Sequence, residues 1–178
     1  MKIILLPFFL LLNLLLYGQE HATLTLGTGA VWTQGNFGIG YRNEIAFPLV
    51  KNFTYGVHLG HIMASDRQVD LTRPGPFDQT SIFFSDLSLA YSPVIASTIR
   101  FSAHASGGVR HVNGVAILVN SSGEVQTPNN HMWGFGLQAG VSADYLITDK
   151  YFIGLQYLHD FYMDGFDYLG LRVGLEFR

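Results

Sequence analysis

The sequence predicts an all-β protein, an eight-stranded antiparallel up-and-down transmembrane β-barrel. Three observations predict it: side chains alternate with a period of two, each alternating run is long, and eight such runs follow one another. From Phe37 onward, apolar side chains take the odd positions, while glycines, serines and charges take the even ones. Each run has about ten residues, which a strand tilted near 45° needs to cross a hydrocarbon core.

The eight predicted strands begin after an apolar leader. They are 22–32, 37–47, 53–63, 82–91, 98–110, 131–145, 151–161 and 166–178. The clearest alternation lies in 131–145, where Trp133, Phe135 and Leu137 share one face with the following odd positions, and glycines, Gln138, Ser142 and Asp144 share the other. An even number of strands is typical of single-chain bacterial barrels.

The connections between these strands alternate in length. Residues 48–52, 92–97 and 146–150 form short links, whereas 64–81 and 112–130 are long. Two further links on the long side, 33–36 and 162–165, are brief. Short turns in the periplasm and longer loops outside are typical of outer-membrane barrels, so both termini are expected in the periplasm.

Aromatic residues gather near the predicted strand ends, as two membrane-interface belts would require. The expected outer belt is Trp32, Phe37, Phe83, Trp133 and Phe161, and the expected inner belt is Phe47, Phe53, Tyr91, Tyr145, Tyr151 and Phe177.

The composition and the first residues of the chain indicate where the protein is located. With 178 residues it is one domain, and 48% apolar against 13% charged residues suggests a non-aqueous exterior. Residues 1–18 have the pattern of a cleaved signal peptide, which leaves 19–178 as the barrel domain. The alternative, an anchoring helix, needs about 20 uninterrupted apolar residues, and Pro7 and Asn13 interrupt this segment.

Cysteine and charge exclude further classes. The chain has no cysteine, which excludes a lipid-anchored lipoprotein and any disulfide. Without residues 1–18, which contain one lysine and no acid, 9 basic residues face 13 acidic ones, a formal charge of −4. This mildly acidic balance does not indicate the basic surface that binds nucleic acid.

A soluble barrel of the lipocalin type is the main structural alternative, with its apolar side chains inside. A water-facing surface would carry many lysines, yet after the leader only Lys51 and Lys150 occur, both in predicted turns. The polar face is instead rich in glycine, which suits the crowded interior of an eight-stranded barrel. We therefore expect the polar face to line the lumen.

The expected lumen network contains both signs of charge. Its members are Arg42, Glu44, His58, Asp86, Arg100, His104, Arg110, Asp144, Asp160, Arg172 and Glu176, with Gln138 and Gln156 beside them. Because an isolated buried charge is costly, these groups should pair and close the lumen. The alternative is a narrow solute channel with a water path past Arg42, Arg100, Asp144 and Arg172. No further ligands at metal spacing accompany His58 and His104, so no metal or other cofactor is expected.

The last strand resembles a known group. Leu169, Leu171, Val173, Leu175 and Phe177 are similar to the C-terminal signal of small eight-stranded outer-membrane barrels of the OmpX and OmpA-membrane-domain type, although here Arg178 follows the aromatic residue. The resemblance implies a monomer in the bacterial outer membrane, in contact with its lipids and lipopolysaccharide. It also implies recognition by the barrel assembly machinery through the last strand.

An enzyme that modifies lipid A is a further alternative, because some barrels of this kind place a His, and a Ser two residues on, toward the bilayer. The matching residue here is His159, but Phe161 stands two positions on. Asp160 points to the other face of the strand, so it cannot pair simply with His159. His61 is followed at the same spacing by Met63. The sequence therefore predicts no catalytic residues.

The long loops are the remaining candidates for function. Phe77 lies in a charged, proline-containing stretch and is a possible contact residue. Val115, Ile117 and Val119 lead to a polar turn and a return segment, which predicts a hairpin. Its edge could pair with an extracellular protein, or the hairpin could fold over the mouth of the barrel. We therefore expect an envelope-structural or surface-interaction protein.

Overall fold

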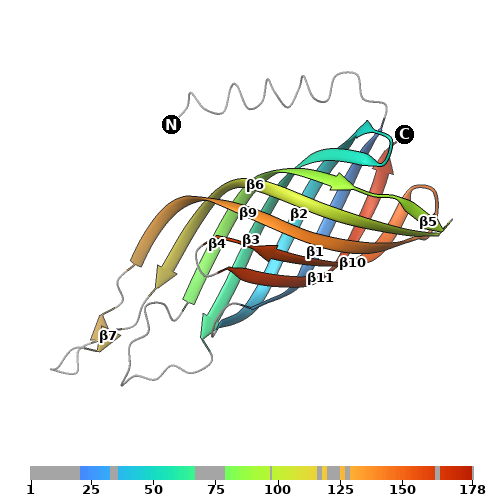
Figure 1. The fold of residues 1–178 in the computed structure, drawn as a ribbon. Coiled ribbons are helices and arrows are strands. Elements are labelled where there is room, and N and C mark those ends of the chain that lie inside the picture. Colours follow the sequence, from blue (N-terminus) through green and yellow to red (C-terminus); the bar gives the residue numbers. More distant parts are fainter. Residues whose placement is uncertain are drawn as a thin grey trace.

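The computed structural model describes residues 21–32, 36–66, 79–96, 98–115, 118–119, 125–126, 129–162 and 165–177. Eight long strands form one closed antiparallel barrel (Figure 1). They are β1 (Ala22–Trp32), β2 (Asn36–Val50), β3 (Phe53–Asp66), β4 (Gln79–Tyr91), β6 (Ile99–Val115), β9 (Asn129–Leu146), β10 (Tyr151–Asp160) and β11 (Phe166–Phe177). The pairing of β4 with β6, β6 with β9 and β1 with β11 closes the ring.

The predicted fold class is confirmed, and the strand bounds differ mainly at one end. β3, β4, β6 and β9 extend several residues into the predicted long loops. The link after β4 contains a short strand, β5 (Val94–Ala96), which pairs with β6 and was not predicted. The predicted hairpin is present as β7 (Leu118–Val119) paired with β8 (Val125–Gln126). The leader at 1–18, Phe77 and Ile117 lie outside the described residues.

The two ends of the barrel differ in shape. The turn end carries His21, Phe177 and the tight links at 51–52 and 147–150. At the long-loop end, β6 and β9 continue beyond the neighbouring strands, and Figure 1 shows them as a curved extension of the wall on the side where β7 lies.

One row of paired residues shows how the barrel closes. Followed through successive register pairs, the row starts on β6 at position 100 and returns to β6 at position 110, a stagger of ten residues. The row consists of Arg100, Asp144, Gly154, Arg172, Gly27, Arg42, Gly60, Phe84 and Arg110. It brings four arginines into the lumen and intersperses them with glycine, so large side chains have room to cross the interior.

The alternation of side chains is as predicted, with polar groups inside and apolar groups outside. On β10 every even residue is buried and the odd residues are exposed, apart from half-buried His159. The outward residues from Tyr151 to Phe161 span about ten positions, a rise of ~25 Å for a tilted strand, which matches the apolar band of outer-membrane barrels. Within the described chain, the model has no helix long and apolar enough to span a membrane.

Most side chains of the two expected aromatic belts are exposed, and the prediction was wrong for one residue. Trp133, Phe161, Tyr145 and Tyr151 are among the exposed outward side chains. Phe47, which was expected in the inner belt, is buried at 2% exposure and packs on Tyr55. Just beyond Phe47, the pairing register of β2 with β3 shifts between Pro48 and Val50.

Candidate functional site

An apolar layer fills the lumen at the long-loop end. It is built from inward-facing side chains of six strands: Val31, Ile62, Ile82, Phe84, Val112, Leu158, Phe166 and Tyr168. Met132 and Tyr162 pack against it. Because these side chains are buried and in mutual contact, the layer separates the polar interior from the loops.

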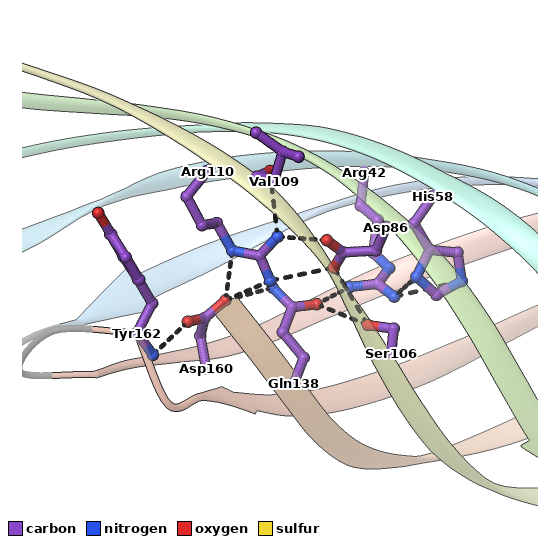
Figure 2. Close-up of polar contacts among 9 residues, drawn as sticks. All are labelled: Arg42, His58, Asp86, Ser106, Val109, Arg110, Gln138, Asp160 and Tyr162. Atoms are coloured by element: carbon purple, nitrogen blue, oxygen red, sulfur yellow. Dashed lines mark hydrogen bonds and ion pairs between the residues drawn. The ribbon is translucent and has the colours of Figure 1, made fainter. Parts of the chain in front are cut away.

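Arg110 is the centre of the polar network below this layer (Figure 2). Its Nε donates to Asp160 at 3.0 Å, and its Nη2 lies 2.8 Å from Asp160 and 3.1 Å from Asp86. Its Nη1 also contacts Asp86. All three side chains are fully buried, and the guanidinium lies 5.2 Å from the Phe84 ring. One arginine therefore neutralises two carboxylates inside a dry layer.

Gln138 links this cluster to a second group of charges. Its Nε2 donates to Asp160 at 2.9 Å, and its Oε1 accepts from Arg42 Nη1 at 2.7 Å. Arg42 also contacts the His58 ring, whose Nε2 lies 2.7 Å from Glu44. Figure 2 shows the side chains from Arg110 to His58 as one continuous chain across the barrel.

A third cluster lies toward the turn end. Arg172 donates to both oxygens of Asp144 at 2.7 Å, and Arg100 reaches Asp144 at 3.3 Å and Glu176 at 2.6 Å. The Phe152 ring contacts both guanidinium groups, 4.6 Å from Arg100 and 5.3 Å from Arg172. Arg100 and Glu176 are partly exposed, so this cluster marks where the lumen meets solvent.

The structure places all eleven residues of the expected network in the lumen, where four arginines face five carboxylates. His104 bonds Ser142 at 2.8 Å. Gln156, also in the lumen, has an unpartnered Nε2. Within the described ranges, no group of three or more His, Asp and Glu side chains has the arrangement of a metal site.

Two glycines on the inner wall make room for this packing. A Cβ at Gly60 would overlap the Phe84 ring, and a Cβ at Gly174 would overlap the Phe152 ring. Both rings contact arginines of the network. The glycine-rich polar face of the sequence is therefore a steric requirement of a filled lumen.

One feature that sequence reasoning missed is an open strand edge. β10 pairs with β9 only up to the pair Asp160 and Gln138, so in the part of the chain that is described, 129–136 of β9 has no strand partner on that side. Among the described residues, the last backbone hydrogen bond on this side is from the Phe161 N–H to the Leu137 carbonyl, at 2.8 Å. Because backbone groups alternate sides along a strand, those of His131, Trp133 and Phe135 face the open edge.

The residues beside this edge are apolar and exposed. Trp133 is 71% and Phe135 67% exposed, both on the outward face. The His111 ring of β6 stacks on His131 and packs at a tilt against Trp133. Val115 and Val119 lie in the strand extension and the hairpin nearby in sequence. The open edge is visible only in the pairing register of β9 with β10, because the edge begins where β10 ends.

A second missed feature is an outward carboxylate near the long-loop end. Asp167 of β11 lies opposite His159 of β10 and accepts from its Nδ1 at 3.0 Å and from the Tyr157 hydroxyl at 2.5 Å. Sequence reasoning considered only Asp160 as a partner for His159. The true partner comes from the next strand, and the pairing register is what places it there.

The chain matches no protein-family model and no curated protein sequence. Solved structures share its fold at low identity. A major outer membrane protein of Thermus thermophilus aligns with a TM-score of 0.61 at 14% identity, over 88% of this chain and 99% of the other. Ail, the attachment invasion locus protein of Yersinia pestis, gives 0.56 at 11% identity, over 89% and 99%.

The N-terminal β-barrel domain of Pseudomonas aeruginosa OprF gives a TM-score of 0.53 at 16% identity, over 89% of this chain and 98% of that domain. These likenesses span nearly the whole of each neighbour, so they concern the complete barrel. Together with the apolar outer band and the polar interior, they identify the chain, in fold, as a small eight-stranded β-barrel of the kind found in bacterial outer membranes.

Proposed function

We propose that this protein is a closed barrel that serves as a surface-interaction component of the outer membrane. Its contact site is the part of β6 and β9 that extends beyond the neighbouring strands. The single observation that carries the proposal is the open edge of β9 at 129–136. An unpaired edge presents backbone donors and acceptors to which an extended segment of another protein can add as a strand. The orientation that the loop lengths predict puts this edge on the cell surface.

Exposed aromatic side chains next to the edge support the proposal. Trp133 and Phe135 are exposed, and their backbone groups face the open side of β9. Large aromatic groups contribute disproportionately to protein contacts, while the backbone pairing supplies affinity that depends little on the partner's sequence. The partner class that fits is an extended polypeptide with apolar side chains on one face.

The lumen supports an interaction role over a channel. Arg110, Asp86 and Asp160 are fully buried in the middle of the barrel, and the apolar layer lies beyond them. Ions would have to cross both layers, and the apolar one offers them no hydration. We expect no persistent discrete openings when the purified protein is placed in a planar bilayer. Steady single-channel steps would support the channel alternative and count against a closed lumen.

A backbone variant tests the contact site. His131→Pro removes one edge N–H, and proline is tolerated on strand edges, so the barrel should still fold. His131→Ala is the matched control, because it loses the same imidazole contacts and keeps the N–H. A short peptide of alternating Val and Thr serves as the probe. We expect it to protect edge amides from hydrogen exchange in the wild type and in His131→Ala, but not in His131→Pro.

An N-methylated form of the peptide controls for apolar adsorption, because it cannot complete the backbone ladder. Equal protection by the methylated peptide, or equal protection of His131→Pro, would show that the edge does not pair. Loss of the mobility shift on unboiled gels would reveal a folding defect in a variant. In that case Trp133→Pro, compared with Trp133→Ala, repeats the test at the next edge residue.

We assign no catalytic role to the outward His159–Asp167 pair. The pair has the orienting carboxylate that a general base needs, but Phe161 occupies the position that a nucleophile would take. Its polar atoms near the long-loop end of the apolar band fit an anchor at headgroup level. Unchanged lipid A mass spectra when the protein is expressed are the expected result, and a change in acylation that His159→Ala abolishes would overturn this assignment.

A further inference from the structure

We propose that the turn-end half of the lumen is a binding site for a small oxyanion, held against Arg172 and His104. This inference is independent of the open β9 edge and goes beyond the proposed surface role. It rests on a cavity, on two lining residues that each carry an unpartnered buried nitrogen, and on the charged groups around them.

The cavity has a mouth and an inner chamber. The mouth, about 510 Å³, is lined by Thr23, Thr54, Arg100 and Glu176 among others at the turn end. The chamber, about 60 Å³, shares Thr23, Thr54 and Arg100 with the mouth and continues inward to His104 and Arg172. Shared walls make the two spaces neighbours, so the chamber is reached from the turn end. Its volume is about twice the share of one water molecule in the liquid, which suits a small ion.

Two buried groups that line the chamber have unused hydrogen-bonding atoms. Arg172 is 5% exposed and uses Nε and Nη2 on Asp144, while its Nη1 has no partner. His104 is 7% exposed and bonds Ser142 through Nε2, while its Nδ1 has no partner. An unmatched buried N–H costs free energy, and when Ser142 donates to Nε2 the ring proton lies on Nδ1, so a ligand that accepts from Nδ1 and from Arg172 Nη1 would be stabilised.

Two arginines, Arg100 and Arg172, and one carboxylate, Glu44, line the chamber, so an anion would bind to donors of these arginines that their ion pairs leave unused. Arg172 and Arg100 line the chamber together with His104. The carboxylates close by already have cationic or imidazole partners: Asp144 has Arg172 and Arg100, and Glu44 has His58. Thr25 and Ser102 also line the chamber and carry hydroxyl groups, and the Ser102 hydroxyl accepts from Ser92 at 2.8 Å. Arginine forks and hydroxyls are the donors that carboxylate and phosphate groups accept.

A calorimetric titration tests the proposal. The full mature barrel, purified in detergent and shown to be folded by its gel shift, is titrated with inorganic phosphate and then with acetate. We expect saturable binding of one phosphate per barrel. Acetate competition would identify carboxylates as ligands too, and its absence would restrict the site to phosphate-like ions. Heats no larger than those of a sodium chloride titration would mean that only water fills the chamber, which overturns the proposal.

A pair of variants locates the site. His104→Leu removes the unpartnered Nδ1 from the chamber wall, and Gln156→Leu removes another unpartnered lumen nitrogen whose residue does not line the chamber. We expect phosphate affinity to fall about tenfold or more in His104→Leu, as for a lost bond to a charged group, and to stay within about twofold in Gln156→Leu. Equal affinity in both variants would refute the assignment.

Ser102→Leu provides a second route to the same answer, because it fills the chamber from β6 without touching the ion pairs. Phosphate binding should be lost if the ion occupies the chamber, and retained binding would place the ion elsewhere and refute the site. These results are separable from the surface proposal, since no variant here alters the β9 edge.

Discussion

Replacement of Arg110 by Met tests the idea that a buried charge cluster holds the barrel closed. The substitution keeps most of the side-chain volume but leaves Asp86 and Asp160 without their shared guanidinium. Asp86 retains one donor, Ser106 at 3.1 Å, and Asp160 retains two, Gln138 at 2.9 Å and the Tyr162 N–H at 2.7 Å, but no cation pairs with either carboxylate. Removing one partner of a buried pair costs about 3–5 kcal/mol, so we expect the unfolding equilibrium to shift by about two to four orders of magnitude.

The measurement is urea unfolding in lipid vesicles, followed by fluorescence of the two tryptophans. Arg100→Met is the matched control, because the same change at the partly exposed turn end should cost only about 1 kcal/mol. Adding Asp86→Asn and Asp160→Asn to Arg110→Met should recover part of the loss, since the uncompensated charges are then gone. The reasoning fails if Arg110→Met costs less than Arg100→Met, or if the neutral triple variant is no more stable than Arg110→Met.

Two further predictions concern packing and the outer surface. Gly60→Ala should reduce the folded, heat-modifiable fraction on gels, because its Cβ would overlap the Phe84 ring. Adding Phe84→Leu to this variant should restore the folded fraction. Gly107→Ala is the control and should behave like wild type, because its Cβ meets the tip of a flexible leucine. Tyr157→Phe should lower the free energy of unfolding by about 1 kcal/mol, because the Asp167 carboxylate loses a donor at 2.5 Å, and an unchanged urea midpoint would show that this bond contributes nothing.

The class of the fold and the residues that face the lumen could be predicted from the amino-acid sequence. Alternation with a period of two is a local property, so each strand reveals its two faces without reference to its neighbours. Scarcity of lysine then assigned the polar face to the interior, and Arg42, Arg110 and Asp144 are all found there. The positions of the strands followed from the same alternation. The errors lie mainly at the strand ends, because loops and strand extensions beyond the membrane have similar amino-acid compositions.

Which of these lumen groups contact one another depends on how the strands pair in three dimensions. The pairing register places Arg110 beside Phe84 and Arg100 beside Asp144, and no local pattern encodes the stagger of ten residues that closes the ring. Register also brings Asp167 to His159, leaves 129–136 of β9 without a neighbour, and separates the apolar layer from the open chamber near Arg172. The physical reason is that strand pairing is non-local, whereas the direction in which a side chain points along one strand is not.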